Sequence, residues 1–172
     1  MVALRGALPR QNARVATFLL TWNPDRVPWT DIGRMARRVQ RGECVRDRWS
    51  CARSKQIRRG DRLFMLRQGA EPRGLFASGR ATTDWYEGPN WHGPGYCHYV
   101  DLLYDMLLDP ARDLLLPRNE LRSGKLARMY WDSQSSGPRI RDDVAAELER
   151  IWSSLSRSAL GNKLRAPPGG LR

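Results

Sequence analysis

The chain has 172 residues, with 30 Lys and Arg against 18 Asp and Glu, a formal charge of +12, and 41% of its residues are hydrophobic. This composition is typical of one globular domain and excludes a disordered chain, and the apolar runs are far too short to cross a membrane. No apolar segment follows the basic start, so no secretory signal is predicted and we expect a soluble, cytoplasmic protein.

The first half of the chain predicts strands separated by one basic helix. Residues 1–14 are basic and show no periodicity, which is typical of a flexible arm. The run 15–21 is rich in β-branched and aromatic residues and predicts a buried strand. A helix with a basic outer face is expected over about 31–41. Further along, we expect an extended segment at 46–51, a turn at 59–61 and a strand at 62–68.

The second half predicts two more strands and the clearest helix of the chain. A hairpin loop at 69–72 leads to a strand at 73–84, and the Gly- and Pro-rich run 86–95 predicts a loop. Residues 96–108 alternate in polarity as a long strand does. In the remainder we expect one helical turn at 117–122, an amphipathic helix at 140–155 and a flexible tail or linker at 156–172.

Strands of mixed length with helices at both ends indicate the α+β class, built on a curved, mostly antiparallel sheet. We therefore expect one domain at 15–155, between a basic arm and a tail. The oligomeric state cannot be read from this pattern.

Few residues in the chain suit catalysis or metal binding. The three cysteines and two histidines fit no zinc spacing, and no hydrolase, metalloprotease or phosphate-loop motif is present. We expect no metal, no cofactor and no catalytic site. One enzymatic alternative is a stand-alone nuclease using Asp101, Asp105 and Asp109, although these alternate with apolar residues as solvated strand positions do.

The positive charge is concentrated in one half of the chain. Residues 1–80 hold 18 basic and 6 acidic residues, whereas residues 81–172 hold 12 of each, and 27 of the 30 basic residues are Arg. Arg presents a planar fork that matches phosphate oxygens, so this asymmetry is typical of a partner that is a polyanion. A GC-rich genome, together with a solvated surface, explains the Arg content equally well.

Tryptophan is the second unusual feature, with seven in the chain. Trp152 falls beside the apolar stripe of the last helix, whereas the other six lie at predicted strand ends or in loops. Three of these are close in sequence to small polar residues, as in Trp22-Asn23, Trp49-Ser50 and Trp131 with Gln134-Ser135. A flat ligand with polar edges needs an aromatic face for stacking and a polar group beside it, so these pairs favour a nucleobase pocket over simple rim packing.

Five segments, taken in order, resemble an EVE domain, a member of the PUA-like superfamily that also includes YTH, ASCH and SRA-like readers. The likeness is greatest to EVE modules that accompany HNH nucleases in bacterial modification-dependent restriction. It extends from about Phe18 to Leu155. The segments are Phe18–Pro24, Arg48–Cys51, Gly60–Leu66, Pro72–Gly79, and Trp131 with Gln134–Gly137.

The resemblance implies a small, closed or nearly closed β-barrel flanked by helices, with a base pocket at one rim. It implies that Trp49-Ser50 forms one wall and that Asn23 reads the base edge. Tyr104 would supply the second aromatic wall, in place of the family's Trp. The full set expected at the pocket is Trp22, Asn23, Trp49, Ser50, Tyr104, Trp131, Gln134 and Ser135.

We therefore expect a non-catalytic reader that flips 5-methyl- or 5-hydroxymethylcytosine out of double-stranded DNA and serves modification-dependent restriction by targeting a nuclease, such as an HNH domain, that is absent from these residues. The alternatives are a YTH-like reader of N6-methyladenine in RNA, the nuclease named above, and a protein-interaction module. Basic side chains on the segments around Trp49 would hold the phosphates. They are Arg53, Lys55, Arg58, Arg59, Arg62, Arg67 and Arg73.

Overall fold

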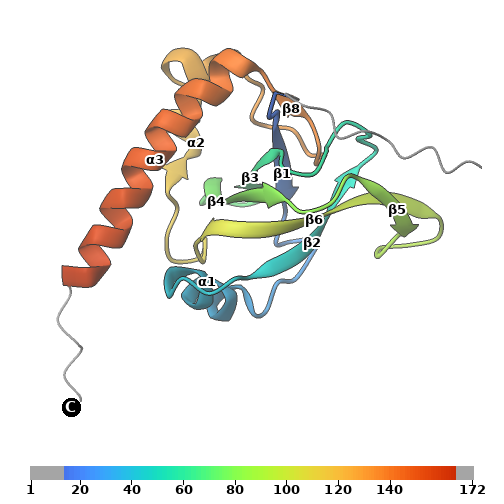
Figure 1. The fold of residues 1–172 in the computed structure, drawn as a ribbon, viewed down its shortest axis with the longest axis horizontal. Helices are drawn as coiled ribbons and strands as arrows, with labels where there is room; N and C mark the ends of the chain where they lie inside the picture. The colour runs from blue at the N-terminus through green and yellow to red at the C-terminus, as the bar shows by residue number, and fades with distance from the viewer. Residues whose placement is uncertain (1–13, 166–172) are drawn as a thin grey trace, which may run out of the picture.

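The computed structural model describes residues 14–165, and within them eight strands form one strongly curved sheet (Figure 1). The strand order is β2-β6-β4-β3-β1-β8, with β5 paired to β6 and β7 to β4. All pairs are antiparallel except β1 with β3. The strands are β1 Thr17–Trp22, β2 Arg46–Ala52, β3 Arg62–Arg67, β4 Gly74–Ala81, β5 Tyr86–Pro89, β6 Tyr96–Leu107, β7 Leu116–Pro117 and β8 Arg139–Ile140.

Three α-helices and one 3₁₀ turn flank this sheet. They are α1 Ile32–Gln40, α2 Arg118–Leu121, η1 Gly124–Arg128 and α3 Asp142–Arg165. In Figure 1, α3 runs along one side of the sheet while β5 lies at the opposite side. The expected α+β class, with a mostly antiparallel curved sheet, is confirmed.

The first strand lies deep in the sheet because both of its faces are apolar. Phe18, Leu19 and Leu20 are all buried, and β1 pairs in parallel with β3, with Leu19 opposite Phe64. Leucine and aromatic side chains on both faces are typical of a strand covered on both sides. The short β8 pairs with the start of β1, so β1 has a neighbour on each side there.

Helix α3 is held against the sheet by an aromatic contact and by ion pairs from Arg62 on β3 and Arg139 on β8. Trp152 packs edge-on against Phe64, with ring centroids 5.3 Å apart, and its Nε1 donates a 2.8 Å hydrogen bond to Ser78 Oγ. Arg62, on β3, pairs with Glu149 of α3 at 3.0 Å and with Asp105 of β6. Two acidic residues in the first turn, Asp142 and Asp143, also favour the helix start through the helix dipole.

Several boundaries differ from the sequence prediction. Residues 86–89 form β5 and pair with β6, although their Gly and Pro predicted a loop. Helix α3 begins at Asp142 and continues to Arg165, so the segment expected as a flexible tail from 156 is helical over most of its length. The predicted arm at 1–13 and the end of the tail at 166–172 lie outside the described residues.

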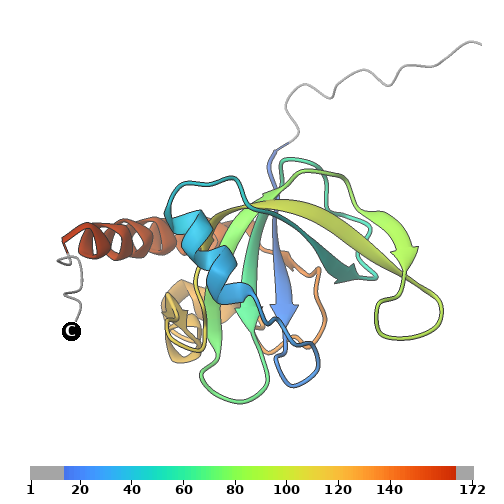
Figure 2. The same cartoon turned by 90° about the horizontal axis from the view of Figure 1, so that it is seen from below.

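The sheet curls toward a barrel without completing its hydrogen-bonded ring. The strands at its two ends are β2 and β8, and no strand ladder joins them among the described residues. Figure 2 shows the sheet curling around its interior, with the β5–β6 hairpin projecting to one side. The gap therefore falls between β2 and the β1–β8 edge. None of the helices in the described part of the chain is long and apolar enough to cross a membrane.

Candidate nucleic-acid interface

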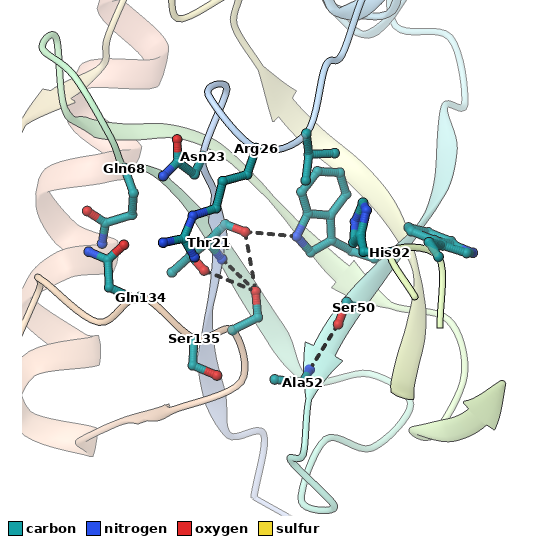
Figure 3. Close-up of a pocket in the computed structure, with 13 residues that line it drawn as sticks. Thr21, Asn23, Arg26, Ser50, Ala52, Gln68, His92, Gln134 and Ser135 are labelled. Carbon is teal, nitrogen blue, oxygen red and sulfur yellow. Dashed lines mark hydrogen bonds between the residues drawn. The ribbon is translucent and has the colours of Figure 1, made fainter. Parts of the chain in front are cut away.

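A cavity of about 220 Å³ opens in the gap between β2 and β1 (Figure 3). It is bounded by the end of β1, the middle of β2, the loop before β8 and the β5–β6 loop. Three amides, four hydroxyls, two indoles, one guanidinium and one imidazole line it, and no carboxylate does. The lining residues are Thr21, Asn23, Arg26, Val27, Trp49, Ser50, Ala52, Gln68, Trp91, His92, Gln134, Ser135 and Ser136.

Side chains bridge this gap where backbone pairing stops. Trp49 Nε1, on β2, donates a 3.1 Å hydrogen bond to the carbonyl oxygen of Thr21 on β1. The Thr21 amide donates to Ser136 Oγ at 2.8 Å, and the Gly137 amide donates to Leu19 O at 2.8 Å. Residues 136–137 thus lie along β1, and Ser136 forms part of one wall of the cavity.

Gly137 lets this wall approach β2. Its φ is +95°, and a Cβ placed there would lie 2.6 Å from Cys51 O and from Ser54 Cβ. Only glycine fits such a conformation and such a close backbone approach without strain. The Gly of the Q-S-S-G segment therefore shapes the cavity although it contributes no side chain.

Two tryptophans supply the aromatic surface of the cavity. Trp49 is half-buried and packs against Trp29, with ring centroids 5.0 Å apart and an interplanar angle of 34°. Trp91, in the β5–β6 loop, is 45% exposed and lies 4.7 Å from the Tyr99 ring. The Arg48 guanidinium covers Trp91 at 4.7 Å from the ring centroid. Each indole is thus supported by a neighbouring ring.

Tyr99 also holds the Trp91 loop through its hydroxyl. This oxygen donates a 2.7 Å hydrogen bond to Pro89 O and accepts the Trp91 amide at 3.2 Å. Burial raises the pKa of Tyr99, which keeps the hydroxyl protonated and able to donate. The loop position of Trp91 therefore depends on contacts within the hairpin.

Three aromatic residues expected at the pocket lie in the core instead. Trp22 and Trp131 are 7% and 2% exposed, and their Nε1 atoms donate 2.8 Å hydrogen bonds to Val27 O and Leu126 O. Tyr104 is 4% exposed and donates to Asp47, and burial raises its pKa well above the usual value. None of the three lines the cavity. The second aromatic surface comes from Trp91, not Tyr104.

The predicted polar residues Asn23, Ser50, Gln134 and Ser135 all line the cavity. Asn23 Oδ1 accepts the Asp25 amide at 3.0 Å, so the side chain also forms the local turn that its Asn-Pro sequence indicates. Ser50 Oγ lies 3.0 Å from Cys97 Sγ and accepts the Ala52 amide at 3.1 Å. These contacts fix both side chains while leaving each of them at the cavity wall.

Sequence reasoning missed a second set of lining residues, among them Arg26, Gln68, Trp91 and His92. Gln68 is buried, and its Nε2 donates to Trp131 O and Ser133 O at 3.1 and 2.8 Å, which positions the loop carrying Gln134. Figure 3 shows Arg26 extending across Thr21. Of these residues, only Trp91 gave a signal in the sequence, because it lies in the Gly- and Pro-rich run 86–95 that predicts a loop, and loop tips often carry function.

The seven predicted phosphate contacts divide into two groups. Arg53, Lys55, Arg58 and Arg59 are exposed, and none forms an ion pair with a described residue, although Arg58 Nη1 donates 3.0 Å hydrogen bonds to Lys55 O and Ile57 O. The other three are committed to the protein itself, through Arg62 with Asp105 and Glu149, Arg67 with Pro110 O, and Arg73 with Glu71.

Arg62 is therefore a structural ion-pair residue, and the expectation that it lies on an open basic rim is wrong. Its side chain is only 10% exposed because it sits between β6 and α3. The exposed cations that remain lie in one stretch, residues 53–59, directly after the β2 strand that carries Trp49 and Ser50. We call this stretch the 53–59 loop.

The carboxylates of the nuclease alternative do not form a site. Asp101 accepts the Tyr86 hydroxyl at 2.6 Å, Asp105 pairs with Arg62, and Asp109 accepts the Ala111 amide at 3.1 Å. No group of three His, Cys, Asp or Glu able to hold a metal ion is found in the described part of the chain.

Comparison of this fold with solved structures finds clear similarity. A hypothetical protein from Leishmania major matches with a TM-score of 0.58 at 15% identity, over 84% of this chain and 98% of that one. A Pseudomonas syringae protein matches at 0.52 and 15%, over 80% and 99%. Human THYN1 in complex with DNA containing 5-methylcytosine matches at 0.53 and 12%, over 80% and 97%.

These likenesses establish a shared fold over nearly the whole length of each neighbour. The same fold is also found in the DUF55 domain of human thymocyte nuclear protein 1, at a TM-score of 0.51 and 14% identity. No protein-family model matches the sequence, and no curated protein does either.

Proposed function

We propose that this chain is a non-catalytic reader of modified DNA and that the cavity between β1 and β2 receives one extruded cytosine bearing a 5-methyl or 5-hydroxymethyl group. The observation that carries this proposal is the lining of the cavity, which combines two indoles with amides and hydroxyls and lacks carboxylates. At about 220 Å³ it is smaller than cavities for drug-sized ligands, as suits a single base. The human neighbour bound to 5-methylcytosine DNA supports the same ligand class.

The lining chemistry gives each group a role in recognition. Trp49 and Trp91 would stack on the base, while the Asn23 and Gln134 amides can pair with the polar edge of a base because each has both a donor and an acceptor. Val27 and Ala52 are the apolar groups available to a 5-methyl substituent. Ser50 is a hydroxyl within the same cavity and could contact an exocyclic group.

The exposed cations of the 53–59 loop would hold the strand. Phosphate contacts supply affinity without reading sequence, whereas the pocket selects the base. Extracting a base costs about a few kcal/mol, and stacking returns about 1–3 kcal/mol per base, so the phosphate contacts must supply much of the remaining affinity. Arg26, which lies in the cavity without a carboxylate partner among the described residues, is a further candidate for this role.

The experiment is a titration at fixed salt with matched duplexes that carry cytosine, 5-methylcytosine or 5-hydroxymethylcytosine, and with RNA that carries adenine or N6-methyladenine. Tighter binding of a modified duplex supports the proposal. A preference for methylated RNA would instead support the alternative, a reader of N6-methyladenine. Equal affinity across the panel would contradict the proposal that the protein reads modified bases. Fluorescence of 2-aminopurine beside the modified base reports extrusion in the same samples.

We further propose that the reader directs a nuclease, as the resemblance to modules that accompany HNH nucleases implies. The chain itself would then leave modified plasmid intact with Mg²⁺ or Mn²⁺. Cleavage by the purified protein would contradict the non-catalytic assignment. In a host carrying this protein, restriction of phage whose DNA contains 5-hydroxymethylcytosine would support the restriction role, provided that the Trp49→Ala variant loses it.

A further inference from the structure

A second hollow of about 550 Å³ lies directly beside the base cavity. It is formed by residues 53–56 after β2 and by residues 133–139 before and into β8. Ser135 and Ser136 line both hollows and form the ridge between them. Figure 3 shows Ser135 at the edge of the base cavity. A ligand larger than one base can therefore extend from the first hollow into the second across this ridge.

The two serines of the ridge differ in what they can offer a ligand. Ser136 Oγ is engaged with Thr21, accepting its amide at 2.8 Å. The Ser135 hydroxyl makes no hydrogen bond with a described residue, and Ser135 is exposed. Serine hydroxyls are common phosphate ligands in nucleic-acid complexes. Ser135 is thus the free donor at the junction between the hollows.

The charge of the second hollow is positive. Arg53, Lys55 and Arg139 line it and no carboxylate does. Arg139 is paired with Asp142 at 3.0 Å, so Arg53 and Lys55 are the cations without an ion-pair partner among the described residues. Lys55 Nζ lies 5.5 Å from the Trp85 ring centroid, which restrains its position without neutralising it.

The cations on the opposite side of the base cavity are less available. There the Arg48 guanidinium is stacked over Trp91 and Tyr99, at 4.7 and 5.0 Å from the two ring centroids. Apart from Arg26, which lines the base cavity itself, the free positive charge beside the cavity therefore lies mainly on the side of the second hollow.

We propose that the second hollow binds the phosphodiester next to the extruded nucleotide, on one side of it only, with Arg53 and Lys55 contacting the phosphate and Ser135 contacting the sugar-phosphate junction on the ridge. This inference rests on the proposed function, because it takes the first hollow as the base site. The base cavity alone does not define the direction in which the bound strand runs. A phosphate contact on one side of the base only would define it.

A scan with neutral phosphates tests this directly. Methylphosphonates are placed one at a time along the strand of a duplex that carries a single 5-methylcytosine, and each affinity is measured at fixed salt. We expect about a tenfold loss at a phosphate on one side of the modified base and little change at the corresponding phosphate on the other side. In the Arg53→Gln/Lys55→Gln variant, that local loss should disappear, and the slope of log affinity against log salt should shrink by about one, because both side chains contact the same phosphate.

The matched control is Arg112→Gln/Arg150→Gln, which removes the same charge from exposed side chains that line neither hollow. It should keep the full methylphosphonate profile. A profile that is symmetric about the modified base, or one that the Arg53/Lys55 variant leaves unchanged, would overturn the inference. Both outcomes can occur with the preference for 5-methylcytosine intact, whereas loss of that preference in the unaltered protein would instead refute the proposed function.

Discussion

Replacing Trp91 with alanine should weaken stacking on the base while leaving the domain folded. Trp91 lies at a hairpin tip, 45% exposed, and contacts mainly Tyr99 and Arg48. Its ring contacts are worth about 0.5–1.5 kcal/mol for the aromatic pair and about 0.5–1 kcal/mol for the cation–π contact. Trp91→Ala should therefore lower the free energy of unfolding by about 1–2 kcal/mol, and the domain should stay folded.

The effect on binding should be larger and specific to the base. A stacked base contributes about 1–3 kcal/mol, which corresponds to a loss of about 5- to 150-fold in affinity. Fluorescence anisotropy with modified and unmodified duplexes measures both affinities, and urea denaturation measures the stability of the same preparation. We expect the preference for modified DNA to fall while weak, salt-sensitive binding remains.

Tyr96→Ala is the matched control because Tyr96 belongs to the same hairpin, is 74% exposed and does not line the cavity. It should leave the preference for modified DNA unchanged. If Trp91→Ala binds as the unaltered protein does, or if Tyr96→Ala loses the preference instead, the assignment of the second aromatic surface fails.

Three further predictions concern the framework of the site. Arg62→Gln should lower the free energy of unfolding by about 1.5–3 kcal/mol, toward the lower value because Asp105 and Glu149 are half exposed, and should not alter the salt dependence of DNA binding. Gly137→Ala should cost about 1–3 kcal/mol in urea denaturation and weaken binding, because a positive φ and a 2.6 Å approach leave no room for Cβ. Burial raises the pKa of Cys51 to about 11 from 9.0 and leaves its thiol without exposed surface, so in the folded protein exposed Cys44 should react with maleimide first at pH 8 and Cys51 should react only slowly. Rapid labelling of Cys51 at neutral pH would show that the β2 end is open.

The fold could be predicted well where sequence pattern and local structure agree. The runs that became β1, β3, β4 and β6 carry strong apolar or alternating patterns, and α3 carries an apolar stripe with acidic residues at its start. The β5 strand was missed because four residues containing Gly88 and Pro89 have little strand propensity of their own. Its pairing with β6 compensates for that weakness.

The polar part of the candidate site was predicted more accurately than its aromatic part. Asn23 and Ser50 reach the cavity because they follow or lie on strands whose edges face the gap in the sheet. Trp22 ends β1 and Tyr104 lies on β6, and both side chains pack inward, where their polar atoms find partners at Val27 and Asp47. Which face is interior depends on the curvature of the whole sheet, so spacing along one strand could not decide it.

The distribution of positive charge could also be predicted only in part. The sequence placed the excess in the first half of the chain, and the folded structure separates cations that are paired within the protein from those that are not. Arg62 could not be excluded from the rim beforehand, because its partners Glu149 and Asp105 become neighbours only in the folded chain. Glu71 is only two residues from Arg73, so that pair could have been considered from the sequence.

Photocrosslinking at the modified position tests the central claim most directly. A duplex with 5-iodocytosine in place of 5-methylcytosine carries a photoreactive atom where the methyl group would be, and mass spectrometry identifies the residue it joins. We expect crosslinks to residues of the base cavity, foremost Trp49 or Trp91. Crosslinks confined to the 53–59 loop or to α3, with none in the cavity, would contradict it.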